Sequence, residues 1–377
     1  MSASTAGRAT LGRKVSNWVS SLFVFDPAGP NWARGVVALD LALVPLLVFW
    51  VIGHQEYLVS AAFGLLLSAL ADPGGGIRFR VSHVAGFGLL GAGVTALGFA
   101  LAGAAWYWLV LVSFGVTLAA GLTLVFGARV GAAALLLNVW FVLSLGHGAG
   151  LQHHADITSH TWAQVVAWAG GSALWVAVMV LGRLIHGHGV RPRPVPELPG
   201  DTARRPLTAP LVAFATIRAV ALAGTVALAF GLNLSHGYWM TIAAVVAMKP
   251  SLEQTTLVAS QRLVGAGLGS AAAIALLLIP AGEHGRQLFT VERGLEVVAL
   301  VLLVHGVAFV FWNYTLYTAV IAAAVLILVD VPHPSDYSAE GYRVLWTVCG
   351  VGIGVLTVLL AGLLSRRTTA AEPAPPP

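Results

Sequence analysis

The sequence is poor in charge. Lys and Arg number 20 and Asp and Glu number 15 among 377 residues, which makes 9% charged residues. Soluble globular proteins carry about 25%. Hydrophobic residues make up 58%, and the mean hydropathy is +0.86. Soluble domains of this total length need polar surfaces that this composition cannot supply. The composition therefore excludes a soluble protein and predicts one that is embedded in lipid.

Cysteine is almost missing as well. Cys349 is the single one, so an intrachain disulfide is excluded. Nucleotide-binding loops, HExxH motifs and catalytic triads are also missing from the sequence, so neither a cofactor nor an enzyme is expected. The basic residues form no continuous patch, which speaks against nucleic acid as a partner. The first 33 residues show no signal-peptide cleavage pattern.

Long apolar runs are abundant instead. A helix needs about 20 apolar residues to cross a bilayer, and long continuous runs favour helices over barrel strands. We therefore predict an all-α polytopic membrane protein with about 12 transmembrane helices. The predicted spans are 34–53, 56–71, 83–103, 105–126, 130–147, 162–183, 215–233, 237–248, 260–279, 292–311, 314–330 and 342–364.

The basic residues predict the orientation of these spans. With the N-terminus in the cytoplasm, every Lys and Arg falls on the inner side except Arg286, Arg293 and Arg343. Cytoplasmic loops of membrane proteins carry an excess of Lys and Arg. We therefore expect a multi-pass protein of a bacterial-type inner membrane with both termini in the cytoplasm.

The spans fall into two similar sets of six. Arg34 and Arg218 each open a first span, and a short second segment then ends at Asp72-Pro73 or at Lys249-Pro250. A glycine-rich span follows in both sets, at an offset of about 180 residues. An even number of spans makes the repeats parallel. The predicted organisation is an N-terminal cytoplasmic segment 1–33, a first six-helix repeat 34–183, a cytoplasmic linker 184–209, a second repeat 210–365 and a cytoplasmic tail 366–377.

Residues 237–273 carry the most distinctive stretch of the chain, GYWMTIAAVVAMKPSLEQTTLVASQRLVGAGLGSAAA. It resembles the fusaric acid resistance protein-like (FUSC) family, which is related to bacterial aromatic acid exporters and plant aluminium-activated malate transporters. The matching positions are Trp239, Thr241, Pro250, Thr255, Arg262, Gly265 and Gly269. Residues 313–331 also resemble the aromatic-rich fifth helix of a family repeat. The first repeat departs from this pattern, with Ala85 in place of Arg262 and Tyr57 in place of Trp239.

The resemblance implies export or conductance of organic anions, often aromatic carboxylates. On this basis Arg262 and Lys249 are candidate ligands for a carboxylate, because a guanidinium can bind it through two hydrogen bonds. Gln261 and Thr255 are polar neighbours of Arg262, and Gln261 and Thr241 are further polar candidates for substrate binding. The alternative for the two cations is that their long side chains extend to the lipid phosphates.

Aromatic and amide side chains complete the predicted substrate-binding set. Trp239 can stack on an aromatic substrate, or it can belong to the interfacial aromatic belt. Asn313, Tyr314 and Tyr317 open the eleventh span and can line a pathway, or they can join helices by hydrogen bonds.

Two ionisable residues inside spans are candidates for proton coupling. Asp40 lies in the first span, where a carboxylate is costly unless it faces water or a partner. It can serve coupling or pair structurally with a base such as Arg34. His305 lies in the tenth span. The His-rich loop 147–160 matches no established metal-binding spacing, so no metal site is predicted.

These features lead to one main hypothesis, a secondary transporter that exports small organic or aromatic carboxylate anions. A passive anion channel and a non-transporting membrane scaffold or envelope subunit are the alternatives. The expected partners are the anion, the lipid bilayer, and a second copy of the chain or a periplasmic adaptor. A hydrated cavity lined by Arg262 and residues 313–317 would favour transport, and a dry centre would favour the scaffold.

Overall fold

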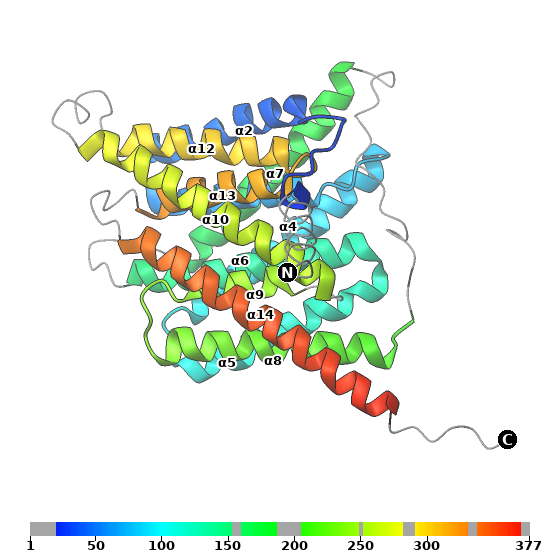
Figure 1. Cartoon of the computed structure of the whole chain (residues 1–377). Helices are drawn as coiled ribbons and strands as arrows, with labels where there is room; N and C mark the ends of the chain where they lie inside the picture. Colours follow the sequence, from blue (N-terminus) through cyan, green and yellow to red (C-terminus); the bar gives the residue numbers. More distant parts are fainter. Residues whose placement is uncertain are drawn as a thin grey trace, which may run out of the picture.

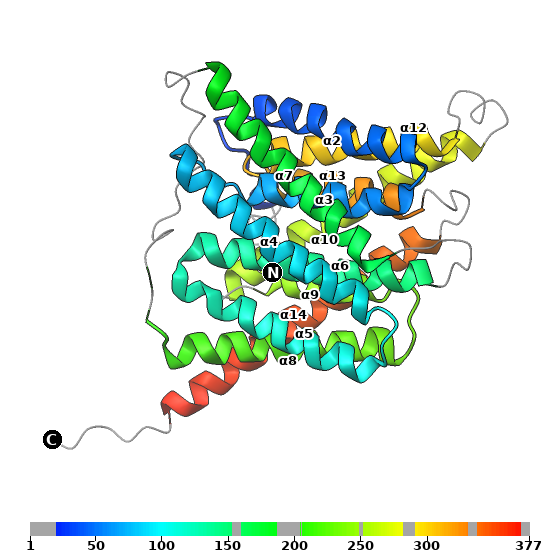
Figure 2. The same cartoon turned by 180° about the vertical axis from the view of Figure 1, so that it is seen from behind.

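The computed structural model describes residues 20–152, 160–186, 204, 206–248, 252–281, 291–330 and 338–370. All elements in this part of the chain are helical (Figures 1 and 2). The α-helices are α2 (Trp32–Ile52), α3 (Leu58–Ala71), α4 (Ile77–Leu101), α5 (Trp106–Leu122), α6 (Ala128–Gln152), α7 (Thr161–His186), α8 (Ala209–Gly231), α9 (Tyr238–Ala247), α10 (Leu252–Ala281), α12 (Val291–Phe309), α13 (Tyr314–Asp330) and α14 (Ser338–Ala370). Two 3₁₀ turns, η1 (Gln55–Tyr57) and η2 (Thr123–Phe126), precede α3 and follow α5.

Eight of the described helices are long and apolar enough to cross a membrane. The other four apolar helices are shorter: 55–71, 238–247, 297–309 and 314–327. The all-helical membrane class predicted from the sequence is therefore confirmed. The count of 12 spans in two repeats stays a prediction, because four of the 12 segments fall short of a full crossing by length and composition.

Helix α10 begins earlier than predicted, at Leu252 instead of near residue 260. Its first residues, LEQTTLVASQ, contain no proline and include several good helix formers, so the helix continues through this polar stretch. Arg262 consequently lies in the third turn of α10 and does not open a helix. This shift moves Arg262 about 15 Å along the helix axis from its first residue.

Helices of the two halves, residues 34–183 and 210–365, pack in a crossed arrangement. Within each half, α3 packs on α7 and α9 packs on α14. Between the halves, α2 packs on α12 and α5 packs on α8, and these two pairs form opposite edges of the molecule (Figures 1 and 2). The short helices α3 and α9 both contact α6 in the interior. The two halves therefore share one body.

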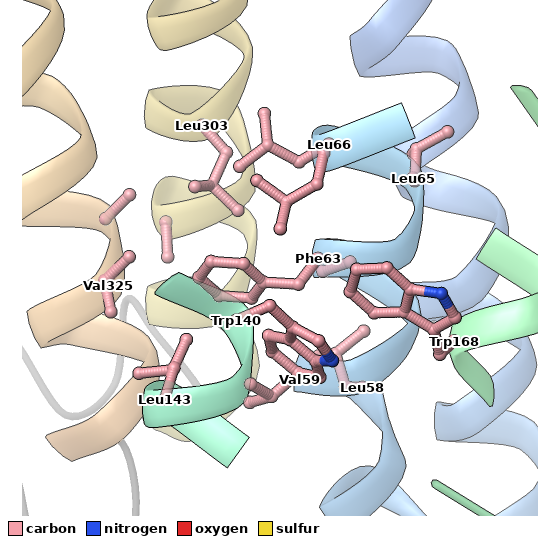
Figure 3. Close-up of a cluster of buried hydrophobic side chains, with 14 of the residues drawn as sticks. Leu58, Val59, Phe63, Leu65, Leu66, Trp140, Leu143, Trp168, Leu303 and Val325 are labelled. Carbon is pink, nitrogen blue, oxygen red and sulfur yellow. The ribbon is translucent and has the colours of Figure 1, made fainter. Parts of the chain in front are cut away.

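The hydrophobic core lies around α3 and α6. Trp140 stacks between Phe63 and Trp168, with ring centroids 5.2 and 4.8 Å apart (Figure 3). Leu303 from α12 and Val325 from α13 complete this cluster across the boundary between the halves. The indole of Trp140 donates to the Thr95 hydroxyl at 2.8 Å. This part of the centre is packed with apolar side chains and has its polar groups satisfied.

The N-terminal segment before α2 docks on the turn between α12 and α13. The Asn313 side chain donates to the Val24 carbonyl at 3.0 Å, and the Thr315 hydroxyl donates to the Leu22 carbonyl at 2.6 Å. Leu22 is buried, and the Phe25 ring packs 4.9 Å from that of Trp312. This segment thus joins the start of the helical body to the turn before α13.

Candidate functional site

A cluster of one cation and two phenols lies between α10 and α13. Arg262 interacts electrostatically with the phenol of Tyr317, and the rings of Tyr314 and Tyr317 lie 5.7 Å apart. The Nε of Arg262 is buried and has no hydrogen-bond partner in the described part of the chain. Close packing brings these helices together, because a Cβ on Gly265 would lie 2.8 Å from the Thr315 carbonyl. This inner cluster joins three of the residues that the sequence predicts for substrate binding.

Asn313, which lies beside this cluster, has a structural role. Its side-chain oxygen accepts from the Leu316 backbone N–H at 2.9 Å and so caps α13, while its nitrogen holds the N-terminal segment. Gln261 lies next to Arg262 in α10 and is half-buried. Lys249 falls outside the described residues.

Trp239 and Thr241 lie on α9, apart from the inner cluster. The guanidinium of Arg343 sits 3.9 Å over the Trp239 ring, and the Arg343 residue is 6% exposed. Thr241 is fully buried, and its hydroxyl has no hydrogen-bond partner among the described residues. The Arg343 contact was missed by the sequence analysis, which counted this residue only as an outer-loop cation. No signal in the sequence joins positions 239 and 343.

Arg218 supports the other end of α9. Its guanidinium is buried and donates to the Val245 carbonyl at 3.0 Å. Val245 lies in the last turn of α9, where carbonyls lack partners within the helix. A cation there also favours the helix dipole. Arg218 therefore stabilises the end of the short helix.

At the C-terminal end of α3, the short helix of the first half, an acidic residue takes part in the contacts instead of a basic one. Asp72 accepts from Nε of Arg80 at 2.9 Å, and the Trp175 indole donates to it at 3.3 Å. Arg129 donates to the Pro73 carbonyl in the same turn. Asp72 is buried and Arg80 is partly buried, and the pair is well bonded, so we interpret it as a structural ion pair that stabilises the first half.

The two residues predicted for proton coupling lie on neighbouring helices. Asp40 is exposed on the outer face of α2, beside exposed valines such as Val36 and Val44. The His305 ring is half-buried, its Nδ1 is bonded to the Val301 carbonyl at 2.7 Å, and it meets Trp32 edge-on. The structure records no contact between Asp40 and His305 among its described residues. The side chain of Arg34, the alternative partner for Asp40, lies outside the described set.

A groove of about 690 Å³ opens between α2 and α7 in the first half. Its walls are apolar, and His54, Tyr57 and His160 lie at one end. None of the residues predicted for substrate binding lines it. The described residues also contain no group of three or more metal-ligating side chains.

Comparison with protein-family models gives one match. Residues 220–357 match the model described as fusaric acid resistance protein-like. Searches of curated proteins and of solved structures gave no match. The matched region contains α9, α10, α12, α13 and the first part of α14, and therefore both the inner cluster and the Arg343–Trp239 contact. The resemblance seen in the sequence is confirmed for residues 220–357, which make up less than half of this multi-pass membrane protein and are similar to the fusaric acid resistance protein-like family.

Proposed function

We propose that this protein is an inner-membrane secondary transporter that exports small organic anions, aromatic carboxylates among them. The observation that carries the proposal is the inner cluster. A guanidinium with a buried, unbonded Nε is costly inside a membrane protein, and such groups commonly mark an ion or substrate pathway. A carboxylate would supply the missing acceptor for Arg262.

The surroundings of Arg262 fit an aromatic anion. Tyr314 and Tyr317 offer phenol rings for stacking and hydroxyls for hydrogen bonding. In the predicted orientation this cluster lies toward the cytoplasm, which is where an exporter collects its substrate. Asp40 and His305 are the proposed proton-coupling groups of this transporter.

A non-transporting membrane scaffold is the second candidate, and one observation favours it. The contact between the halves around Phe63, Leu303 and Val325 is packed and apolar (Figure 3). A transporter that is closed at its centre would have the same packed contact. A measurement of flux must therefore decide between the transporter and the scaffold.

The test is efflux of radiolabelled benzoate from proteoliposomes that contain the purified protein. We expect the wild type to release benzoate faster than protein-free vesicles do, and Arg262→Ala to lower that rate at least tenfold, as expected for the loss of about 1.4 kcal/mol or more of anion binding. Arg262→Lys keeps the charge and should retain part of the flux. The matched control is Arg78→Ala, because Arg78 is an exposed arginine of α4.

Two results would overturn the proposal. A wild type that moves no benzoate or other aromatic carboxylate would leave the scaffold as the better account. A wild type that moves benzoate while Arg262→Ala does so equally well would remove Arg262 from the site. Proton coupling is tested in the same vesicles, since an imposed pH gradient should drive efflux by the wild type and fail to drive it in Asp40→Asn.

A further inference from the structure

The apolar groove between α2 and α7 is elongated along both helices. Val44 and Ile52 line it on α2, and these positions lie about 12 Å apart along that helix. On α7 the lining runs from Trp162 to Leu174, a rise of about 18 Å. One leaflet of a bilayer contributes half of a hydrocarbon core that is roughly 30 Å thick. The groove is therefore about as long as the hydrocarbon part of one leaflet is deep.

Small residues make the room for this groove. Ala61 of α3 and Ala163, Ala167 and Gly170 of α7 all line it. Gly171, which also lines it, lies on the Ala61 carbonyl, so the backbones of α3 and α7 are in contact there. A Cβ on Gly170, in contrast, would meet nothing within 4 Å. The groove is thus the space that small side chains leave open beside a tight helix contact.

The helix pair α9–α14 of the second half packs in the same register as the pair α3–α7. Gly350 of α14 lies on the Met240 carbonyl, as Gly171 lies on the carbonyl of Ala61. A Cβ at either glycine would overlap the facing carbonyl. Positions 61 and 171 become 240 and 350 by the same shift of 179 residues. A residue in one pair therefore has a definite counterpart in the other.

Large aromatic residues stand in the second half where the groove has alanines. The shift of 179 residues turns Ala163 and Ala167 into Tyr342 and Trp346. The rings of these two aromatic residues stack with their centroids 6.4 Å apart. The Trp346 indole donates to the Ser235 carbonyl at 2.7 Å, in the turn between α8 and α9. The second half thus fills this place with its own side chains, whereas the first half leaves a groove.

The rim of the groove is continuous with the surface that faces lipid. Val48, Ile52 and Val166 line the groove and are exposed. The helices that carry them, α2 and α7, are both long and apolar enough to cross a membrane. Exposed apolar side chains on such helices contact the lipid tails. A lipid tail can therefore enter the groove from the side without crossing water.

The polar side chains of the lining lie at one end of the groove. His54 and Tyr57 follow the last residue of α2, and His160 and Trp162 lie at the start of α7. The other residues of the lining are apolar. Tyrosine and tryptophan gather where the hydrocarbon region meets the lipid headgroups. This end of the groove therefore lies at the level of the headgroups.

The two histidines at this end suit a phosphate. Both are exposed, and the His160 ring stacks on that of Trp162 at 6.3 Å. Nδ1 of His54 is bonded to the Glu56 carboxylate at 2.9 Å, which orients the ring. An imidazolium donates from both nitrogens, so Nε2 of His54 can donate to a phosphate oxygen. Within the described part of the chain no carboxylate lines the groove, so the charge of its polar end is complementary to an anion.

We propose that the groove between α2 and α7 binds one phospholipid of the surrounding leaflet. One acyl chain lies along the groove, and the phosphate lies at His54 and His160. The length of the groove, its continuity with the lipid-facing surface and the position of its polar end support this occupant. The site belongs to the first half and does not depend on the proposed transport through the second half.

The test counts the phospholipids that stay on the protein after purification in detergent. Ala163→Tyr combined with Ala167→Trp places the aromatic pair of the second half in the groove. Native mass spectrometry should show one phospholipid more per chain on the wild type than on this double variant. Ala169→Trp is the matched control, because Ala169 is an exposed residue of α7 outside the groove lining. This control should keep the phospholipid.

A second variant guards against a double variant that does not fold. Gly170→Phe also fills the groove, and a Cβ at this position meets no atom within 4 Å. It should therefore keep the fold and lose the phospholipid. Added phosphatidylglycerol should raise the thermal unfolding midpoint of the wild type more than that of Gly170→Phe, because a ligand that binds the folded state stabilises it. Ala169→Phe is the control and should respond like the wild type.

The position of the phosphate is tested by combining His54→Ala with His160→Ala. Titration of the delipidated protein with phosphatidylglycerol should give an affinity at least threefold weaker than that of the wild type. An unchanged affinity would show that the phosphate does not lie at the histidines.

Three results would overturn the lipid site. The first is a wild type without a retained phospholipid, or a Gly170→Phe protein that retains it equally well. The second is a retained apolar molecule without a phosphate, which would identify a different ligand. The third is a wild-type dimer that dissociates in Gly170→Phe, which would identify the groove as a contact between two copies of the chain. None of these results depends on benzoate efflux, so the proposed function is judged separately.

Discussion

Among the described residues, the first half of the molecule pairs its buried carboxylate with a cation, whereas the second half leaves the Nε atoms of two arginines without a hydrogen-bond partner. Asp72 and Arg80 form an ion pair at the C-terminal end of α3, and the Gln164 side chain is hydrogen-bonded to the Ser60 hydroxyl and the Glu56 carbonyl. In the second half, the Nε atoms of Arg218 and Arg262 and the hydroxyls of Thr241 and Ser270 are buried without a hydrogen-bond partner among the described residues. The first half also has such atoms, at Ser113 and His147.

The two halves differ in the kind of buried polar atom that lacks a hydrogen-bond partner. The first half leaves a hydroxyl and an imidazole nitrogen, and the second half leaves guanidinium nitrogens as well. An unsatisfied cationic group costs more than an unsatisfied neutral one. Residues 220–357, which match the family model, include most of these groups. We therefore expect the first half mainly to support the body and the second half to carry the binding chemistry of the proposed transporter.

The largest expected effect comes from breaking the ion pair of the first half. Asp72→Asn leaves the partly buried guanidinium of Arg80 without its carboxylate, so the free energy of unfolding should fall by up to about 5 kcal/mol. Thermal or denaturant unfolding in detergent measures this loss. The double variant with Arg80→Gln removes both charges and should recover part of the stability. A loss below about 1 kcal/mol for Asp72→Asn would show that this ion pair does not stabilise the first half.

The close glycine contacts should give a smaller effect, equal in both halves. Gly171→Ala and Gly350→Ala each push a Cβ into a carbonyl of the facing helix, and each should cost about 3 kcal/mol by overpacking. Gly170→Ala and Gly352→Ala are matched controls, because nothing lies within 4 Å of a Cβ there. These controls should gain up to about 1 kcal/mol from helix propensity. Unequal losses of stability in Gly171→Ala and Gly350→Ala would show that the two close contacts are not equivalent.

The smallest expected effect on stability is at Arg262. Replacing this half-buried cation by Met removes its charge together with the unbonded Nε, so the free energy of unfolding should change by less than about 1 kcal/mol. Benzoate efflux should nevertheless fall, as for Arg262→Ala. Unfolding in detergent and efflux are measured on the same preparation. A loss of stability as large as that of Asp72→Asn would show that Arg262 is a structural residue. The two halves would then not differ in the role of their cations.

Most helices could be predicted from the sequence, because apolar runs and polar turns fix their approximate ends. The early start of α10 could not be predicted. Hydropathy indicates which residues of a helix can lie in lipid, but it does not show whether the helix continues into a polar stretch. The grouping of Arg262 with Tyr317 was anticipated only through the resemblance to a family. Arg343 was missed because its contact with Trp239 spans over one hundred residues. The ion pair of Asp72 and Arg80 crosses a loop that hydropathy does not resolve.

The docking of residues 22–24 on the turn before α13 has a consequence for biosynthesis. The bonds from Asn313 to Val24 and from Thr315 to Leu22 join positions that are 289 and 293 residues apart. The segment before α2 thus has to wait until about 290 further residues have been translated. At about 5 to 20 residues per second, that wait lasts roughly 15 to 60 seconds. Until then α2 and its leading segment lack this anchor, so this part of the body is completed only after the start of α13 has been translated.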